Sequence, residues 1–210
     1  GELDGTEDAL PVAMADLLIG DQSVAQWLAS AEAFIEAATQ RGAVIVTYSP
    51  LLRPIAADLE SKLSEGALLH CQLADLRSFA HGRHLWLAER PRDTVVLALI
   101  EPSLSALWDK MRDLFPRNVP TFSMPLPGAL PRDLIAGLVA QMHLVDAIAK
   151  KMGKDPGQPN VPQFGRDIYY LDLPEFIPVP EARVPADEQS KYDVLGARWP
   201  SPRKRSDMSR

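Results

Sequence analysis

The chain has 210 residues, with an apolar fraction of 46% and a charged fraction of 24%, which is typical of a globular protein with room for one full domain. Its net charge of −6 and isoelectric point of about 5.2 disfavour nucleic acid or an anionic membrane surface as the main partner. The single cysteine, Cys71, excludes an internal disulfide, no apolar run reaches the roughly 18 residues of a membrane span, and the acidic residues 1–10 differ from a basic signal peptide.

Helical and strand patterns alternate through residues 13–154. In residues 23–40 apolar side chains recur at three- and four-residue spacing, which predicts an amphipathic helix that ends at Gly42. The run AVIVTY at 43–48 is rich in β-branched residues without polar alternation, so it predicts a strand buried on both faces. We expect further helices at 54–65, 103–115 and 131–152, further strands at 67–73, 94–100 and 119–124, and a helix, or a loop and a helix, at 75–89.

This alternation predicts an α/β fold, namely a three-layer sandwich with a mainly parallel, flavodoxin-like sheet. Residues 1–12 are expected to form a flexible acidic arm ahead of the domain at 13–154. Nine of the 19 prolines fall within 155–202, which favours an extended Pro-rich docking tail at 155–180 and a disordered basic tail at 181–210. Within the docking tail, the run 167–173 is expected to add a short strand or to lie extended.

One turn lies where α/β folds bind ligands. Ser49 directly follows the strand predicted at 43–48, at its carboxyl end. The turn YSPLLRP has no glycine to allow a close backbone approach to a phosphate, which favours a shaped turn over a phosphate cradle. The sequence has no G-x-G-x-x-G, G-x-x-x-x-G-K-[ST], H-E-x-x-H or C-x-x-C motif, so we expect no cofactor and no metal.

The stretch KLSEGALLHCQLADLRSFAHGRHLWLAE at 62–89 has a recognisable order of polar residues. Lys62 and Glu65 end a predicted helix, His70 lies five residues after Glu65, and the pair His81-Gly82 begins eleven residues after His70. This order resembles the sugar isomerase (SIS) domain family, in particular the second SIS domain in the isomerase part of glucosamine-6-phosphate synthase. The resemblance extends over about residues 23–172 and implies a parallel α/β domain.

The resemblance implies roles for two of these residues. Glu65 takes the place of the base that moves a proton between C1 and C2 of the opened sugar. His81 takes the place of the ring-opening histidine, which the family contributes across a dimer. A carboxylate and an imidazole suit these proton transfers.

The sequence departs from the family at three positions. Ala80 replaces a lysine, Arg83 replaces a proline, and Arg166 stands where the family's synthase has a tail lysine that engages the substrate carbonyl. Since arginine stays protonated, it cannot form a Schiff base there. These departures favour binding over catalysis.

The residues also have simpler interpretations. Glu65 and Lys62 near a helix end can be solvated surface groups, and His70 within an apolar strand can be a hydrogen-bonded core histidine. His81 and His84 are spaced for one helical face, but no third ligand is spaced to support a metal site. Three arginines can hold a ligand phosphate through their bidentate guanidinium groups, namely Arg53, Arg83 and Arg166.

Two functions follow as expectations. The first is an SIS-type phosphosugar-binding module used for ligand binding, dimerisation or regulation, with Ser49, Arg53, Lys62, Arg83 and Arg166 as ligand-binding candidates. The alternative is a phosphosugar aldose–ketose isomerase, or half of one, with Glu65 and His81 as its catalytic residues. The expected partners are a sugar phosphate or related small anion and a second copy or another SIS domain. The expected location is the cytoplasm.

Overall fold

The computed structural model describes residues 17–126, 131–158 and 160–171. The chain forms two compact units, residues 1–160 and 161–210, and each is described by itself. The first unit contains, in chain order, β1 (Leu18–Ile19), β2 (Gln22–Ser23), α1 (Val24–Ser30), α2 (Glu32–Arg41), β3 (Ala43–Tyr48), α3 (Arg53–Glu65), β4 (His70–Asp75), α4 (Leu76–Ser78), α5 (Leu85–Glu89), β5 (Thr94–Ile100), α6 (Ser105–Asp113), β6 (Thr121–Pro125) and α7 (Arg132–Lys151). Short 3₁₀ turns at Pro50–Leu52 and Pro102–Leu104 precede α3 and α6, and a π-helical turn at Phe79–Arg83 joins α4 to α5.

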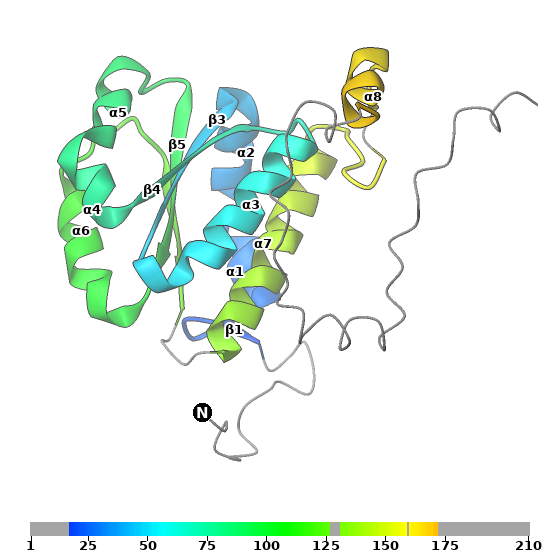
Figure 1. Cartoon of the computed structure of the whole chain (residues 1–210). Coiled ribbons are helices and arrows are strands. Elements are labelled where there is room, and N and C mark those ends of the chain that lie inside the picture. Colours follow the sequence, from blue (N-terminus) through cyan, green and yellow to red (C-terminus); the bar gives the residue numbers. More distant parts are fainter. Residues whose placement is uncertain (1–16, 127–130, 159, 172–210) are drawn as a thin grey trace, which may run out of the picture. The chain divides into compact units, whose positions relative to one another are not determined.

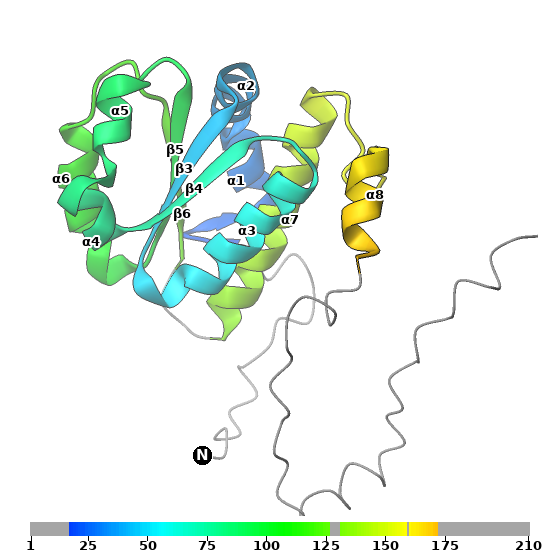
Figure 2. The same ribbon diagram turned by 45° about the horizontal axis from the view of Figure 1, so that its top comes forward.

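The central sheet has four parallel strands in the order β4-β3-β5-β6. When only the four strands of this sheet are counted in chain order, the order is 2-1-3-4, which is flavodoxin-like. Helices α1, α2, α3 and α7 cover one face of the sheet, and α4, α5 and α6 cover the other (Figures 1 and 2). The expected three-layer parallel α/β fold is therefore confirmed.

The strand side chains divide between two hydrophobic cores. On β3, Val44, Val46 and Tyr48 face the core beneath α1, α2, α3 and α7, while Ile45 faces the core beneath α4, α5 and α6. Every residue of β5 is buried. The apolar runs without polar alternation were correctly interpreted as strands buried on both faces.

The helix expected at 23–40 is interrupted. It begins with a capping box, in which Ser23 accepts from the Gln26 N–H and the Gln26 side chain accepts from the Ser23 N–H. At Ala31 the chain closes a tighter turn, because the Ala31 N–H donates to the Leu28 carbonyl, and α2 then begins at Glu32. The expected end at Gly42 is confirmed, with φ of 80°.

The strand expected at 67–73 begins later, at His70. The Gly66 N–H donates to the Lys62 carbonyl and the Leu68 N–H donates to the Leu63 carbonyl, with Ala67 in the left-handed region at φ 47°. These bonds cap the end of α3 and hold residues 66–68 out of the sheet.

The second unit contains helix α8 (Gln163–Tyr169). The Arg166 guanidinium donates to the Val161 carbonyl (2.7 Å) and to the Gln163 side chain, which in turn donates to Asp167. The expectation of a strand or extended run at 167–173 is therefore wrong for residues 167–169, because these local bonds favour a helix. The acidic arm at 1–12, the rest of the docking tail from 172 to 180 and the basic tail at 181–210 lie outside the described residues.

Helices α3 and α7 pack closely at Gly137. A Cβ atom placed there would meet the side chain of Ile55, including Cγ1 at 3.2 Å, and Leu126 Cδ1 at 3.2 Å. Only glycine allows this approach without moving a buried neighbour, and Ile55 is fully buried.

We predict that Gly137→Ala lowers the free energy of unfolding by about 1–2 kcal/mol, because overpacking outweighs the better helix propensity of alanine. Ile55→Val removes Cδ1, so the double variant should recover about 1 kcal/mol relative to the sum of the two single effects. Urea unfolding of the three variants measures this coupling. Additive effects would contradict the proposed close contact.

Candidate functional site

The structure brings together two of the sequence-predicted residues, Lys62 and Glu65. Both line a cavity of about 390 Å³ between the end of α3, helix α7 and the loop that follows α7. This volume lies within the range of small-molecule sites in proteins. The lining residues are Lys62, Glu65, Gly66, Met142, Val145, Asp146, Pro156 and Gly157.

The amphipathic pattern of α3 explains why Lys62 and Glu65 share this position. Leu59 and Leu63 are buried in the core, and residues three apart lie on one face of a helix. The Lys62 ammonium donates to Asp58 Oδ1 at 2.7 Å, and the Ser61 hydroxyl donates to Glu65 Oε1 at 2.8 Å. A second oxygen, Glu65 Oε2, has no partner among the described residues.

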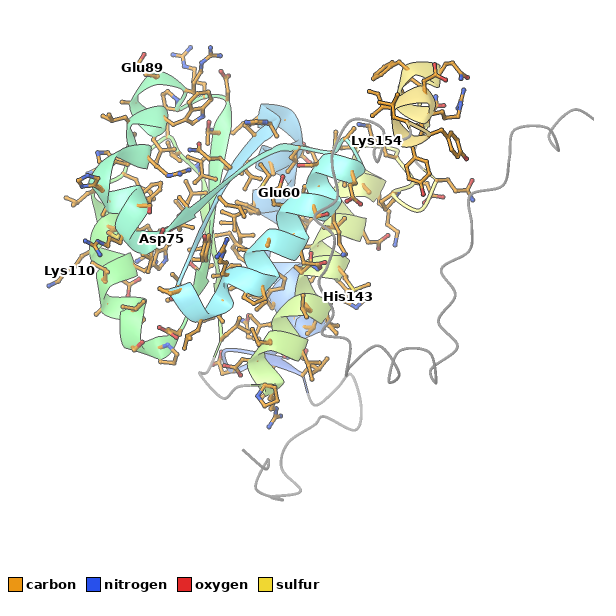
Figure 3. The ribbon with its side chains drawn as sticks, in the orientation of Figure 1. Glu60, Asp75, Glu89, Lys110, His143 and Lys154 are labelled. Atoms are coloured by element: carbon orange, nitrogen blue, oxygen red, sulfur yellow. The ribbon has the colours of Figure 1, made fainter. Side chains whose placement is uncertain are left out.

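The loop after α7 is tied to the end of α3. The Lys154 ammonium donates to the Ala67 carbonyl, and the Gly157 N–H donates to Asp155 Oδ1 at 2.9 Å. Figure 3 shows Lys154 beyond the end of α7, with Glu60 on α3 and His143 on α7. His143 is exposed rather than packed.

The cavity presents charges of both signs. Its lining includes one cationic side chain, Lys62, and two carboxylates, Glu65 and Asp146. Asp146 also accepts from Lys150 at 2.6 Å on the exposed side of α7. These side chains can donate hydrogen bonds to a polar ligand and accept hydrogen bonds from it, but they do not form a strongly positive pocket.

His81 and Arg83 lie away from this cavity within one chain. They belong to the π-helical turn after β4, on the other helical layer from α3. Glu65 precedes β4 and His81 follows it. The two residues therefore lie toward opposite ends of this strand, which is roughly 16 Å long. The exposed His81 therefore cannot meet Glu65 in a single copy of the described fold.

Arg83 has a structural contact. Its guanidinium donates to the Leu73 carbonyl at 3.1 Å, on β4, which is an edge strand of the sheet. His84 Nδ1 lies 2.9 Å from the Phe79 carbonyl, so this nitrogen carries the proton of that hydrogen bond.

His70 is exposed at the first position of β4. The interpretation of His70 as a buried core histidine is therefore wrong. The reason is that β4 is an edge strand and begins at this residue, so the side chain lies at the margin of the sheet.

Ser49 lies at the point where the strand order reverses, between the carboxyl ends of β3 and β5. Its side chain is 0% exposed, and its hydroxyl accepts from the Glu101 N–H at 3.2 Å. The Leu52 N–H donates to the Ser49 carbonyl, as in a shaped turn. A ligand would reach the Ser49 hydroxyl only after these two loops had moved apart.

The remaining arginine candidates do not join Lys62. Arg53 is exposed at the start of α3, and the 13 residues of that helix place it about 18 Å from Glu65. Arg166 lies in the second unit, where its guanidinium is bound to Val161 and Gln163. Their roles as ligand-binding residues stay predictions.

Sequence reasoning missed Asp146, which lines the cavity, and the residues behind Lys62, namely Asp58, which binds its ammonium, and Gln141, which donates to Asp58. The spacing of Asp58 and Lys62 by four residues on a predicted helix was a usable signal. Gln141 was detectable only as a polar residue within the apolar pattern of 131–152. Nothing in the sequence indicated that it would meet Asp58.

Asp75 was also missed, as the N-cap of α4. Its carboxylate accepts from the Ser78 hydroxyl at 2.5 Å and from the Ser78 N–H at 2.9 Å. These hydrogen bonds lower the pKa of the Asp75 carboxyl, with the hydroxyl contributing most. Figure 3 shows Asp75 where β4 meets α4.

Within residues 17–126, 131–158 and 160–171, no group of three or more His, Cys, Asp or Glu side chains is placed to hold a metal ion. In those same ranges, no helix combines the length and apolarity required to cross a bilayer.

No family model matches the sequence, and no curated protein matches it significantly. A solved structure described as a candidate phosphosugar isomerase involved in capsule formation, from Bacteroides fragilis, has a TM-score of 0.46 and 11% identity, covering 65% of this chain and 90% of its own. One described as a candidate sugar-phosphate isomerase from Listeria monocytogenes has a TM-score of 0.45 and 10% identity, covering 61% of this chain and 80% of its own. At these values the fold assignment rests on the strand order and register of this chain.

Cys71 is unsuited to nucleophilic chemistry. Burial raises the pKa of its thiol to about 12, and the negative charge of Glu60 adds to this increase. We predict that Ellman's reagent reacts with folded protein at pH 8 at least about a hundredfold more slowly than with protein unfolded in guanidinium chloride. Similar rates in the two states would contradict this prediction.

The same shift has a consequence for stability. The pKa of the folded-state thiol lies above its unshifted value of 9.0, so its contribution is fully present below about pH 9 and is lost as the pH rises toward 12. Urea unfolding of the Cys71→Ala variant between pH 9 and 12 should therefore show a smaller decrease in the free energy of unfolding than the unchanged protein shows.

Proposed function

We propose that this chain is an SIS-type phosphosugar-binding module whose α3–α7 cavity forms one part of a site completed by a second copy or another SIS domain. The observation that carries the proposal is that Lys62 and Glu65, which have the family's spacing, line one cavity of ligand size. The resemblance implies that Glu65 faces the sugar.

The charges of the cavity support a shared site. A phosphate dianion placed against Glu65 and Asp146 would be repelled, and Lys62 is already paired with Asp58. Carboxylates and an ammonium group suit sugar hydroxyls instead. Under this proposal the paired domain binds the phosphate.

The position of His81 also favours pairing. It is exposed on the other layer and beyond the other end of β4 from Glu65. A site containing both residues requires the histidine of one subunit and the glutamate of another. This matches the cross-dimer role that the resemblance implies for His81.

The second candidate function is aldose–ketose isomerisation, favoured by the Glu65 carboxylate. One of its oxygens accepts from Ser61, and the other has no partner among the residues that the structure describes. In that reaction Glu65 takes a proton from C2 of the open-chain aldose and returns it to C1 of the enediol, while the C1 oxygen gains a proton and the C2 hydroxyl loses one. The changes at Ala80, Arg83 and Arg166 favour binding over this activity.

The test of binding is thermal unfolding with fructose 6-phosphate and glucose 6-phosphate. A ligand at about 100 times its dissociation constant stabilises the folded state by about 2.7 kcal/mol, which corresponds to an increase in Tm of about 5–10 °C. We expect Glu65→Gln and Lys62→Met to reduce this increase. If a panel of sugar phosphates leaves Tm unchanged, the binding proposal is wrong.

Glu60→Gln is the matched control. Glu60 accepts from Ser64 at 2.9 Å, at the same four-residue spacing as Glu65 and Ser61 but with the serine after the glutamate, and it does not line the cavity. Its ligand-induced shift should equal that of the unchanged protein, and an equal loss in both variants would sink the assignment of Glu65.

Isomer exchange between the two sugar phosphates, followed by NMR in the same samples, separates the two functions. Stabilisation without exchange supports the binding module. Exchange that is lost in Glu65→Gln supports the isomerase, while exchange that survives this substitution excludes Glu65 as the base.

A further inference from the structure

A buried amide lies behind the Lys62 side of the cavity. Gln141 is 0% exposed on α7, where its buried neighbours include Ala140, Leu144 and Val145. Its side-chain nitrogen donates to Asp58 Oδ2, and the other oxygen of Asp58 accepts from Lys62 at 2.7 Å. A continuous chain of polar contacts therefore runs from the core between α7 and α3 to the cavity.

The orientation of the amide follows from charge. If the amide were turned over, its oxygen would face the Asp58 carboxylate, so the nitrogen must be the atom that points at Asp58. In this orientation Gln141 Oε1 is buried without a hydrogen-bond partner among the described residues. Such an atom is unfavourable for stability, and an apolar side chain of similar size would avoid that cost.

An ion pair on a helix surface is not by itself well fixed. The Lys62 and Asp58 side chains are 36% and 35% exposed, and pairs of this kind are mobile and weak. Here a donor from a second helix occupies the other carboxylate oxygen. The carboxylate is thereby held in one orientation, and the ammonium that it binds is held with it.

We infer that Gln141 and Asp58 are positioning residues that hold the Lys62 ammonium at the cavity for a ligand. This inference rests on the proposed function. A lysine fixed before binding loses less side-chain freedom when it meets the sugar. The unsatisfied oxygen of Gln141 is then a stability cost that accompanies an ordered binding group.

The test uses the full chain without any sugar, so that its result does not depend on sugar binding. Acetic anhydride acylates lysine side chains, and peptide mass spectrometry gives the rate at each position. A lysine held against a carboxylate reacts slowly because the carboxylate covers its nitrogen. We expect Asp58→Asn to raise the rate at Lys62 about threefold and Gln141→Met to raise it about twofold.

Glu36→Gln provides the control. Glu36 pairs with Lys151 in another ion pair of the same domain, away from the cavity lining. This variant should raise the rate at Lys151 and leave the rate at Lys62 unchanged. A rise at Lys62 in this control as well would reveal a global change and overturn the inference.

The Tm of the Gln141→Met variant distinguishes a structural role of Gln141 from a positioning role. Gln141→Met removes the buried unsatisfied oxygen together with the donor to Asp58 and keeps an apolar chain of similar length, so the two effects offset and Tm should stay within about 3 °C. An unchanged Lys62 rate in either variant, or a rise that occurs only together with a large loss of Tm, overturns the inference. Failure to bind sugar phosphates would instead overturn the proposed function and leave the acylation result standing.

Discussion

The close packing of helices α3 and α7 at Gly137 determines which residues face each other along the cavity. The missing Cβ allows Ile55 and its neighbours to pack against the α7 backbone. One turn further along both helices, Gln141 meets Asp58, and beyond that Val145 and Lys62 line the same cavity. The contacts advance in the same direction on both helices, so a shift at Gly137 would change every later pair.

The parallel sheet gives the molecule two chemically different ends. At the carboxyl ends of the strands, where α/β folds usually bind ligands, the Ser49 hydroxyl is buried against the Glu101 backbone. The cavity of ligand size with family-like residues instead lies near the start of β4, between α3 and α7. Under the proposed function, a second domain must cover this end, because one chain supplies Glu65 there but not His81.

The sequence allowed the strands and most helices to be predicted because local patterns determine them. AVIVTY and TVVLALI were correctly interpreted as strands 43–48 and 94–100, since continuous burial on both faces leaves no polar alternation. The break at Ala31 could not be predicted, because alanine favours helix and no glycine or proline marks the turn. The exposure of His70 depends on strand order, which a local pattern does not contain.

The same distinction applies to the site. Lys62 and Glu65 could be predicted to lie together because their spacing of three residues fixes their relation on one helix. Gln141 could not be connected with them, since its contact with Asp58 joins positions 83 residues apart and depends on how two helices pack. Local chemistry was therefore predictable, whereas the support for that chemistry required the tertiary structure.

Under the proposed function, the replacement of a proline by Arg83 affects the geometry of the shared site. A proline at this position has no donor side chain, whereas Arg83 donates to the Leu73 carbonyl and ties the π-helical turn to the edge of its own sheet. His81, two residues earlier, is therefore carried on a segment anchored to β4. Under the proposed function, a second subunit that uses His81 must approach the side of the domain where β4 meets α4, because this anchor holds the segment to its own sheet.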